Sequence, residues 1–221
     1  MSGLNAKVVL VTGSSRGIGA AIARAFATHS AKVAVHGRDA DALSAVHGDI
    51  EREGGVAVQV PGDVTKFAEI EAMRHRIEET LGPIDILVAN AGGSFTTPGP
   101  VEELSEEGRH ASIDGNLTAT FLTIKSFLPG MKERKAGSVI TISSSAGRKP
   151  HPNAPIPYAA AKAGIQILTQ DVAAQVGPYG VRLNCIAPET ILTERNQQRI
   201  PEVSRTLHCF WHPMKHDGLQ V

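Results

Sequence analysis

The sequence predicts a single α/β domain, a doubly wound and mostly parallel sheet covered by helices on both faces. Three observations predict this fold class. Short β-branched runs alternate with longer helical patterns, as right-handed strand–helix–strand crossovers require. Glycine is abundant, with 22 residues in a chain of 221, and several glycines directly follow predicted strands. We find no repeat, low-complexity tract or linker that would divide the chain.

Six short apolar runs are predicted as strands, separated by helical segments. The strands are expected at 7–11, 32–36, 56–60, 84–89, 138–142 and 181–187, and the helices at 17–28, 39–53, 66–81, 105–131 and 158–176. Asp39 is expected to cap the second helix, and Gly82-Pro83 ends the third. The segment 105–131 carries one apolar stripe at helical spacing, formed by Ile113, Leu117, Phe121, Ile124 and Leu128.

Composition excludes several classes of function. The chain has 22 basic and 22 acidic residues and only 4% aromatic residues, so it lacks the charge and the stacking surface of a nucleic-acid-binding protein. Two cysteines are too few for a disulfide framework and favour a reducing compartment. Because the apolar runs are also too short for a signal core or a membrane span, we expect a soluble, cytoplasmic protein with no membrane partner.

A glycine-rich turn follows the first predicted strand, with the sequence Thr12-Gly-Ser-Ser-Arg-Gly-Ile-Gly19. Gly13 allows a sharp turn, Gly17 allows the backbone to approach a pyrophosphate, and Gly19 allows close packing of helix and strand. The start of the following helix then faces the phosphates. The turn therefore predicts a dinucleotide site.

The residues near the end of the second predicted strand bear on the choice between NAD and NADP. Asp39 lies twenty residues after Gly19, and the spacing rule alone would assign it to the ribose hydroxyls of NAD. Asp39 is better placed as a helix cap, however, whereas Arg16 and Arg38 could converge on a 2′-phosphate. NADP(H) is therefore favoured over NAD(H), and NAD dependence remains an alternative.

A tyrosine and a lysine lie four residues apart in the sequence Tyr158-Ala-Ala-Ala-Lys162. On a helix they share one face, where the ammonium lowers the pKa of the phenol and equips it to exchange a proton with a carbonyl or alcohol oxygen. Three serines, 143–145, end the fifth predicted strand at the edge where ligands bind in this architecture. One of their hydroxyls could hold the substrate oxygen.

Together these motifs resemble the short-chain dehydrogenase/reductase family, in its 3-oxoacyl-thioester reductase-like group, over about residues 7–193. The motifs that carry the resemblance are the glycine turn 12–19, Asp63-Val64, Asn90-Ala-Gly92, Asn116, Ile142-Ser-Ser-Ser-Ala-Gly147 and Tyr158–Lys162, and they occur in the family's order.

The resemblance implies a Rossmann-like fold and a role for each matched residue. Tyr158 is implied as the acid/base, Lys162 as the residue that binds the nicotinamide ribose and lowers the phenol's pKa, and Ser144 as the group that orients the substrate oxygen. Asn116 is implied to support a water-linked proton path to Lys162. The implied cofactor-binding set is Gly13, Ser15, Arg16, Gly17, Ile18, Gly19, Arg38, Asp63, Val64, Asn90, Ala91, Gly92, Tyr158, Lys162 and Thr193.

The sequence departs from the family's pattern after the sixth predicted strand. Glu189 stands where the family usually has glycine, and 194–221 lacks the expected final helix and strand, so we expect a shortened domain, 1–193, with a divergent tail. Cys209, His212 and His216 have the spacing of zinc ligands but lack a second pair, and no metal site is predicted. The helices 105–131 and 158–176 remain available to pair subunits of a homo-oligomer.

The expected function is hydride transfer between NADP(H) and a small carbonyl or alcohol substrate. The alternative is a non-catalytic relative that binds a dinucleotide or a partner without turnover. The loops 94–101 and 148–157 are expected to select the substrate, whose identity the sequence leaves open.

Overall fold

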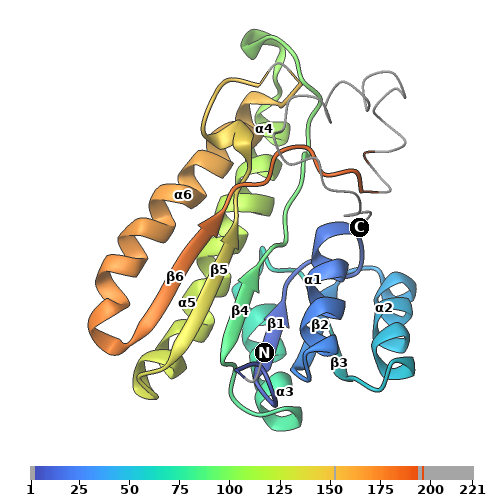
Figure 1. Cartoon of the computed structure of the whole chain (residues 1–221). Coiled ribbons are helices and arrows are strands. Elements are labelled where there is room, and N and C mark those ends of the chain that lie inside the picture. The colour runs from blue at the N-terminus through green and yellow to red at the C-terminus, as the bar shows by residue number, and fades with distance from the viewer. Residues whose placement is uncertain (1–2, 152, 194–195, 197–221) are drawn as a thin grey trace, which may run out of the picture.

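The computed structural model describes residues 3–151, 153–193 and 196, and its core is one six-stranded sheet (Figure 1). The strands lie in the order β3-β2-β1-β4-β5-β6, and every neighbouring pair is parallel. Their bounds are β1 Val8–Val11, β2 Lys32–Gly37, β3 Val56–Pro61, β4 Ile86–Ala89, β5 Gly137–Ile142 and β6 Val181–Ile186. The predicted doubly wound, parallel fold is confirmed.

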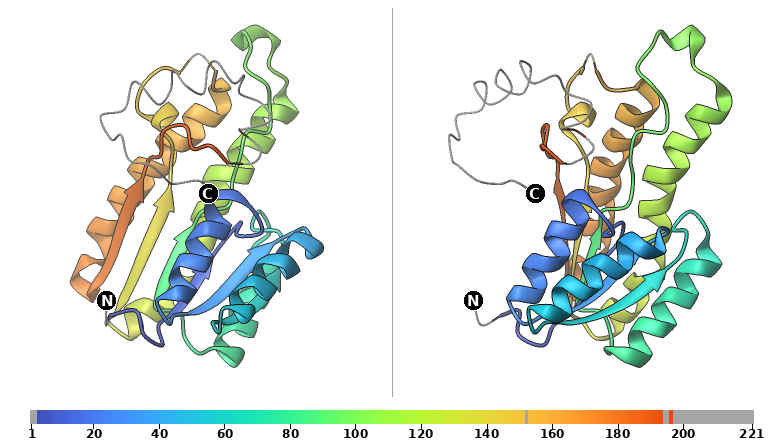
Figure 2. Two further views of the ribbon diagram at one scale, coloured as in Figure 1. Left: turned by 45° about the vertical axis from the view of Figure 1, so that its right-hand side comes forward. Right: turned by 90° about the vertical axis from the view of Figure 1, so that its right-hand side faces the viewer.

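The helices cross between the strands and cover both faces of the sheet (Figure 2). They are α1 Gly17–Thr28, α2 Ala40–Arg52, α3 Phe67–Thr80, α4 Glu106–Ile113, α5 Ala119–Glu133 and α6 Ile156–Val176. Short turns of 3₁₀ helix lie at Val101–Glu103, Ser145–Gly147 and Gly177–Tyr179. The capping prediction is also confirmed, because the side chain of Asp39 accepts a hydrogen bond from the backbone N–H of Ala42 at the start of α2.

Two apolar cores form because successive strand residues point to opposite faces of the sheet. Val9 and Val11 pack with α1 and α2 on one face. Val8 and Leu10 pack with α3, α5 and α6 on the other. All four valine and leucine side chains are 4% exposed or less, so the central strand is apolar on both faces.

The predicted helix 105–131 is instead two helices joined by a single π-helical turn, Asp114–Thr118. The apolar stripe read from the sequence is not uniformly buried. Ile124 faces the core at 3% exposure, whereas Phe121 is 48% exposed. The prediction of helical structure over 105–131 is confirmed, whereas the π-helical turn inside it was not predicted.

All strands run in the same direction, so their carboxyl ends meet at one edge of the sheet, and the loops that follow them lie together there. The predicted absence of a final strand and the Cys209–His216 spacing fall outside the described residues. Of the helices that the structure describes, none is long and apolar enough to cross a membrane.

Candidate functional site

The glycine turn after β1 has the sharp turn at Gly13 and the close packing at Gly19 that the sequence predicted. Gly13 (φ +65°) and Gly17 (φ +55°) have backbone conformations that other residues rarely adopt. A Cβ on Gly19 would lie 2.3 Å from the carbonyl oxygen of Gly13, which only glycine avoids. A Cβ on Gly17 would lie 3.4 Å from Thr193 Cγ2. Thr193, in the segment after β6, therefore lies next to the glycine turn.

Helix α1 presents an N-terminus suited to an anion. Arg16 occupies the N-cap position but makes no side-chain capping bond, and the first turn carries no acidic residue. The first N–H groups of the helix and the positive end of its dipole therefore remain for a ligand at the glycine turn. The residues present fit the pyrophosphate of a dinucleotide.

Asn90 joins the turn to the end of β4. Its Nδ2 donates to the carbonyl oxygens of Thr12 (2.9 Å) and Gly13 (3.1 Å). Thr12 Oγ1 in turn accepts from the backbone N–H groups of Asn90 and Ala91, both at 3.0 Å. These bonds fix the ends of the two central strands relative to each other.

At the end of β2 the structure pairs Arg16 with Asp39. The guanidinium of Arg16 forms an ion pair with the carboxylate of Asp39. The hydrogen bond from Ala42 and, second to it, the contact with Arg16 lower the pKa of Asp39. Arg38 is exposed and its charge acts on Asp63, whose pKa is lowered mainly by the backbone N–H of Thr65.

Asp63 and Val64 follow β3 in a loop held by α3. Asp63 Oδ1 accepts from the backbone N–H of Thr65 at 3.0 Å and from its hydroxyl at 2.8 Å. The backbone N–H of Asp63 donates to Glu69 Oε2 at 2.7 Å. Val64 is buried. The loop is thus fixed before any ligand binds.

Tyr158 and Lys162 lie on one face of α6, as predicted. Lys162 Nζ is 5.7 Å from the centroid of the Tyr158 ring and donates to the carbonyl oxygen of Ile142, at the end of β5, at 2.8 Å. Lys162 is 3% exposed, and burial lowers its pKa to about 8. The ammonium is therefore charged at neutral pH and held next to the phenol ring.

The three serines after β5 differ in their surroundings. Ser143 is buried; its hydroxyl donates to the carbonyl oxygen of Lys162 at 2.6 Å and accepts from Gln166 Nε2 at 2.9 Å. Ser145 is also buried. Ser144 is half-buried, and its hydroxyl oxygen accepts from the backbone N–H of Ala146 at 3.2 Å. Among the three, Ser144 is the one with a side chain that is not fully buried.

Asn116 lies in the π-helical turn and connects it to the loop after β4. Its Nδ2 donates to the carbonyl oxygens of Ser112 (2.8 Å) and Gly93 (2.9 Å), and its Oδ1 accepts from the N–H of Gly93 at 3.1 Å. A Cβ on Gly92 would lie 2.5 Å from Asn116 Oδ1 and 3.3 Å from Lys162 Nζ. Gly92 therefore lets Asn116 and Lys162 approach the same stretch of backbone.

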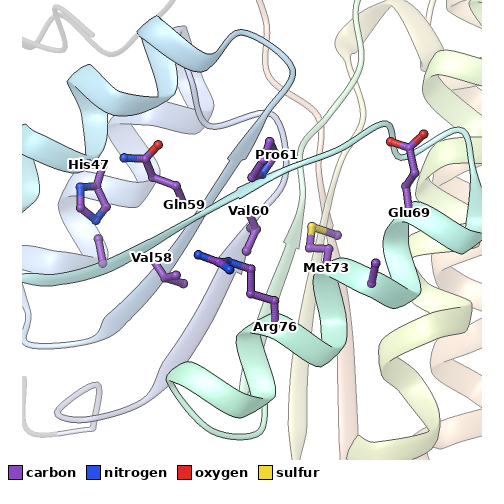
Figure 3. Close-up of a pocket in the computed structure, with 10 residues that line it drawn as sticks. His47, Val58, Gln59, Val60, Pro61, Glu69, Met73 and Arg76 are labelled. Carbon is purple, nitrogen blue, oxygen red and sulfur yellow. The ribbon is translucent and has the colours of Figure 1, made fainter.

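A surface cavity of about 670 Å³ lies elsewhere, along the outer edge of β3 between α2 and α3 (Figure 3). Its lining includes His47, Gln59, Met73 and Arg76. None of the predicted site residues lines it. Among the described residues, no group of three His, Cys, Asp or Glu side chains could hold a metal ion.

Glu189, where the sequence departs from the family's pattern, follows β6 and lies beside the loop after β5. Its carboxylate is 3.8 Å from the ammonium of Lys149, on the loop that follows β5. The backbone N–H of Ser145 donates to the carbonyl oxygen of Pro188 at 2.9 Å. The segment after β6 is thus attached to one of the loops expected to select the substrate.

Sequence reasoning missed two residues that join the parts of this site. His36 is buried at the end of β2 and contacts Gly13, and Ser14 is buried and contacts His36. A histidine within an otherwise apolar strand was the available signal. Its partners could not be read from the sequence because they lie in other segments.

The fold and site define a class of protein that binds a dinucleotide at the carboxyl edge of a parallel sheet, beside a buried lysine and a tyrosine. The family model for short chain dehydrogenases matches residues 7–203. Glucose 1-dehydrogenase 2 of Bacillus subtilis is 37% identical over 217 residues, which are 97% of this chain and 83% of the relative.

Solved structures are similar to this chain in both fold and sequence. A 3-oxoacyl-[acyl-carrier protein] reductase with bound NAD from Brucella melitensis has a TM-score of 0.82 and 34% identity, covering 88% of this chain and 74% of that one. A metagenomic short-chain oxidoreductase in complex with NADP has a TM-score of 0.78 and 35% identity, covering 85% and 84%. The chain belongs to the short-chain dehydrogenase family. It is an oxidoreductase of the class that acts on an alcohol or a carbonyl group with a nicotinamide dinucleotide.

Proposed function

We propose that this protein transfers a hydride between NADP(H) and a carbonyl or alcohol substrate, with Tyr158 as the acid/base. The observation that carries the proposal is the position of Lys162 Nζ, buried, held by Ile142 and 5.7 Å from the Tyr158 ring. An ammonium in that place stabilises the phenolate that remains when Tyr158 gives up its proton. Ser144 orients the substrate oxygen toward the phenol, and Asn116 supports the resupply of protons.

The residues assigned to the cofactor would together form one cradle for the dinucleotide. Gly13, Ser15, Gly17, Ile18 and Gly19 would hold the pyrophosphate with backbone N–H groups. Asp63 and Val64 would lie at the adenine, the segment 90–92 at the ribose, and Thr193 at the other side of the glycine turn. When bound, the nicotinamide supplies or accepts the hydride, while the protein orients the substrate and moves the proton.

NADP(H) is proposed over NAD(H) because Arg16 and Arg38 flank the end of β2, whereas Asp39 is engaged in capping α2 and pairing with Arg16. Each carboxylate oxygen of Asp39 thus already has a partner within the protein, which disfavours Asp39 as the residue that binds the ribose hydroxyls. The solved relatives described above carry NAD in one case and NADP in the other, so the family accommodates either.

The test uses the chain's 2 tyrosines as a matched pair. Tyr158→Phe should reduce NADPH oxidation by about 10²–10⁴-fold, the range of general acid–base catalysis, across a panel of ketones and 3-oxoacyl thioesters. Tyr179→Phe, which alters an exposed ring 4.0 Å from Lys132 Nζ, should leave turnover unchanged. Both variants should bind NADPH as the wild type does.

Two outcomes would contradict the proposal. Near-normal turnover by Tyr158→Phe would remove the role assigned to that residue. Cofactor binding by the wild type without turnover on any member of the panel would support the non-catalytic alternative.

A homo-oligomer is proposed through α4, α5 and α6. Phe121 and Ile167 are about half exposed, at 48% and 55%, on a surface hollow that Leu117 and Leu168 also line. Two large apolar side chains exposed together on neighbouring helices favour association with a second copy.

A further inference from the structure

We infer that His36 is a positioning residue of the cofactor site, where its imidazole joins the glycine turn after β1 to the loop after β3. The inference rests on the proposed function, because it concerns how the same dinucleotide cradle is held in shape.

The imidazole of His36 bridges two segments, with one hydrogen bond at each ring nitrogen. The backbone N–H of Gly13 lies 3.0 Å from Nδ1, and the carbonyl oxygen of Gly62 lies 3.0 Å from Nε2. An amide N–H can only donate, so Nδ1 must accept; a carbonyl can only accept, so Nε2 must carry the hydrogen. Only one neutral tautomer satisfies both contacts.

The peptide unit between Thr12 and Gly13 is held from both sides as a result. Its N–H donates to His36, and its C=O accepts from Asn90 Nδ2 at 2.9 Å. Gly13 follows with φ +65°, where the chain turns toward the phosphate-binding amides. Fixing the plane of this peptide sets the direction in which the glycine turn begins.

The backbone of His36 adds a second attachment to the same turn. Its N–H donates to Ser14 Oγ at 2.8 Å, and its carbonyl oxygen accepts from the N–H of Ser14 at 2.7 Å. Ser14 and His36 are 0% and 3% exposed. Two successive residues of the turn are therefore bound to one residue of β2.

On its other side His36 reaches the loop proposed to contact the adenine. Gly62 immediately precedes Asp63, whose N–H is bound to Glu69 at 2.7 Å, and Glu69 accepts from Lys66 at 3.0 Å. One imidazole thus connects the pyrophosphate half of the cradle to the adenosine half. Its removal would leave the partly buried N–H of Gly13 and the partly buried C=O of Gly62 without these partners.

The charged groups that act on the ring are Asp63 in the loop after β3 and Arg38 at the end of β2, with Glu69 and Lys66 of the α3 region beyond Asp63. Burial lowers the pKa of His36 to about 4, although the Gly62 bond and the Asp63 charge oppose that effect. Protonation would place a hydrogen on Nδ1 and break the bond from Gly13. Dinucleotide affinity should therefore fall as the pH approaches 4.

The test compares the full-length wild type with His36→Asn and His36→Leu, using NADP⁺ in calorimetric titrations. Asparagine places Oδ1 near the position of Nδ1 and can accept from Gly13, so its Kd at pH 7 should stay within about threefold of the wild type. Leucine cannot accept, and its Kd should rise about tenfold, the equivalent of one buried hydrogen bond. His47→Asn, on the far side of α2, should match the wild type.

The pH dependence separates positioning from general stability. Between pH 7 and pH 4 the Kd of the wild type should rise about twofold more than that of His36→Asn, because about half of the His36 side chains are protonated at pH 4. Comparing the two proteins at each pH cancels the titration of the ligand's own 2′-phosphate. The comparison of the wild type with His36→Asn still tests the inference if His36→Leu does not fold.

Equal pH profiles for the wild type and His36→Asn would overturn the inference. So would a His36→Leu variant that unfolds at lower urea but binds NADP⁺ as tightly as the wild type. Failure of the wild type itself to bind NADP⁺ or NAD⁺ would instead overturn the proposed function, and this inference with it.

Discussion

Asp39 caps helix α2 and pairs with Arg16 through the same carboxylate. One oxygen accepts from the N–H of Ala42 at 3.0 Å, and the other contacts the guanidinium at the glycine turn. The pair joins the turn after β1 to the start of α2, so a 2′-phosphate that approaches Arg16 meets an arginine already engaged by a carboxylate.

Asp39→Asn should therefore strengthen binding of NADP⁺. Asparagine is also a good cap, so α2 is preserved while the competing charge is removed. We expect the Kd of NADP⁺ to fall about two- to fivefold, the range of an exposed ion pair, and that of NAD⁺ to change less. Asp41→Asn removes the same charge in the first turn of α2 without touching Arg16 and is the control for calorimetric titration. Loss of NAD⁺ affinity in Asp39→Asn would indicate that Asp39 binds the ribose.

Lys162 should make the stability of the wild type rise with pH in the alkaline range. Burial lowers its pKa to about 8, against 10.5 for the unfolded chain, so between these values the unfolded state binds more protons. The free energy of unfolding, taken relative to Lys162→Met, should increase by roughly 3 kcal/mol from pH 8 to pH 10.5.

Urea denaturation of both proteins at several pH values measures this difference. Lys66→Met is the control. Glu69 raises the pKa of Lys66, so the free energy of unfolding of the wild type relative to Lys66→Met should change with pH in the opposite direction, if it changes at all. If the difference in free energy of unfolding between the wild type and Lys162→Met does not change with pH, Lys162 keeps its proton in the folded protein throughout this range.

Two glycine-to-alanine changes in helices should have opposite effects on stability. A Cβ on Gly19 would lie 2.3 Å from the Gly13 carbonyl and 2.5 Å from Asn90 Nδ2, so Gly19→Ala should destabilise by about 1–3 kcal/mol and weaken dinucleotide binding. A methyl group added at Gly48 in α2 would meet no atom of another segment within 4 Å, so Gly48→Ala should stabilise by about 0.5–1 kcal/mol. Urea unfolding curves compare them; equal effects would contradict the close approach at Gly19.

Association should depend on the apolar side chains exposed on α5 and α6. Phe121→Glu and Ile167→Glu should each shift the protein toward the monomer, because a charge replaces a large apolar contact at the proposed subunit interface. Val101→Glu changes an apolar residue that is 66% exposed but lies outside α5 and α6, and it should leave the assembly unchanged. Analytical ultracentrifugation measures the result. An oligomer that survives both changes would place the interface elsewhere.

The sequence by itself determined the class of fold, and most elements end within a few residues of their predicted bounds. It could do so because apolar periodicity and glycine turns are local signals: β1, the glycine turn and α1 are contiguous, and the Asp39 cap is decided within four residues. The Tyr158–Lys162 pair was readable for the same reason, since one helical turn brings the two side chains together.

Only the tertiary structure decided what depends on distant contacts. The π-helical turn at Asn116 is held by Gly93 from another segment, and the apolar stripe of the helix is only partly buried, with Phe121 48% exposed. Arg16 pairs with Asp39, and His36 binds Gly13 and Gly62, across strands that the sequence separates by more than twenty residues. A residue pattern reports periodicity within one element, whereas these partners are chosen by parallel pairing that brings the ends of different strands together.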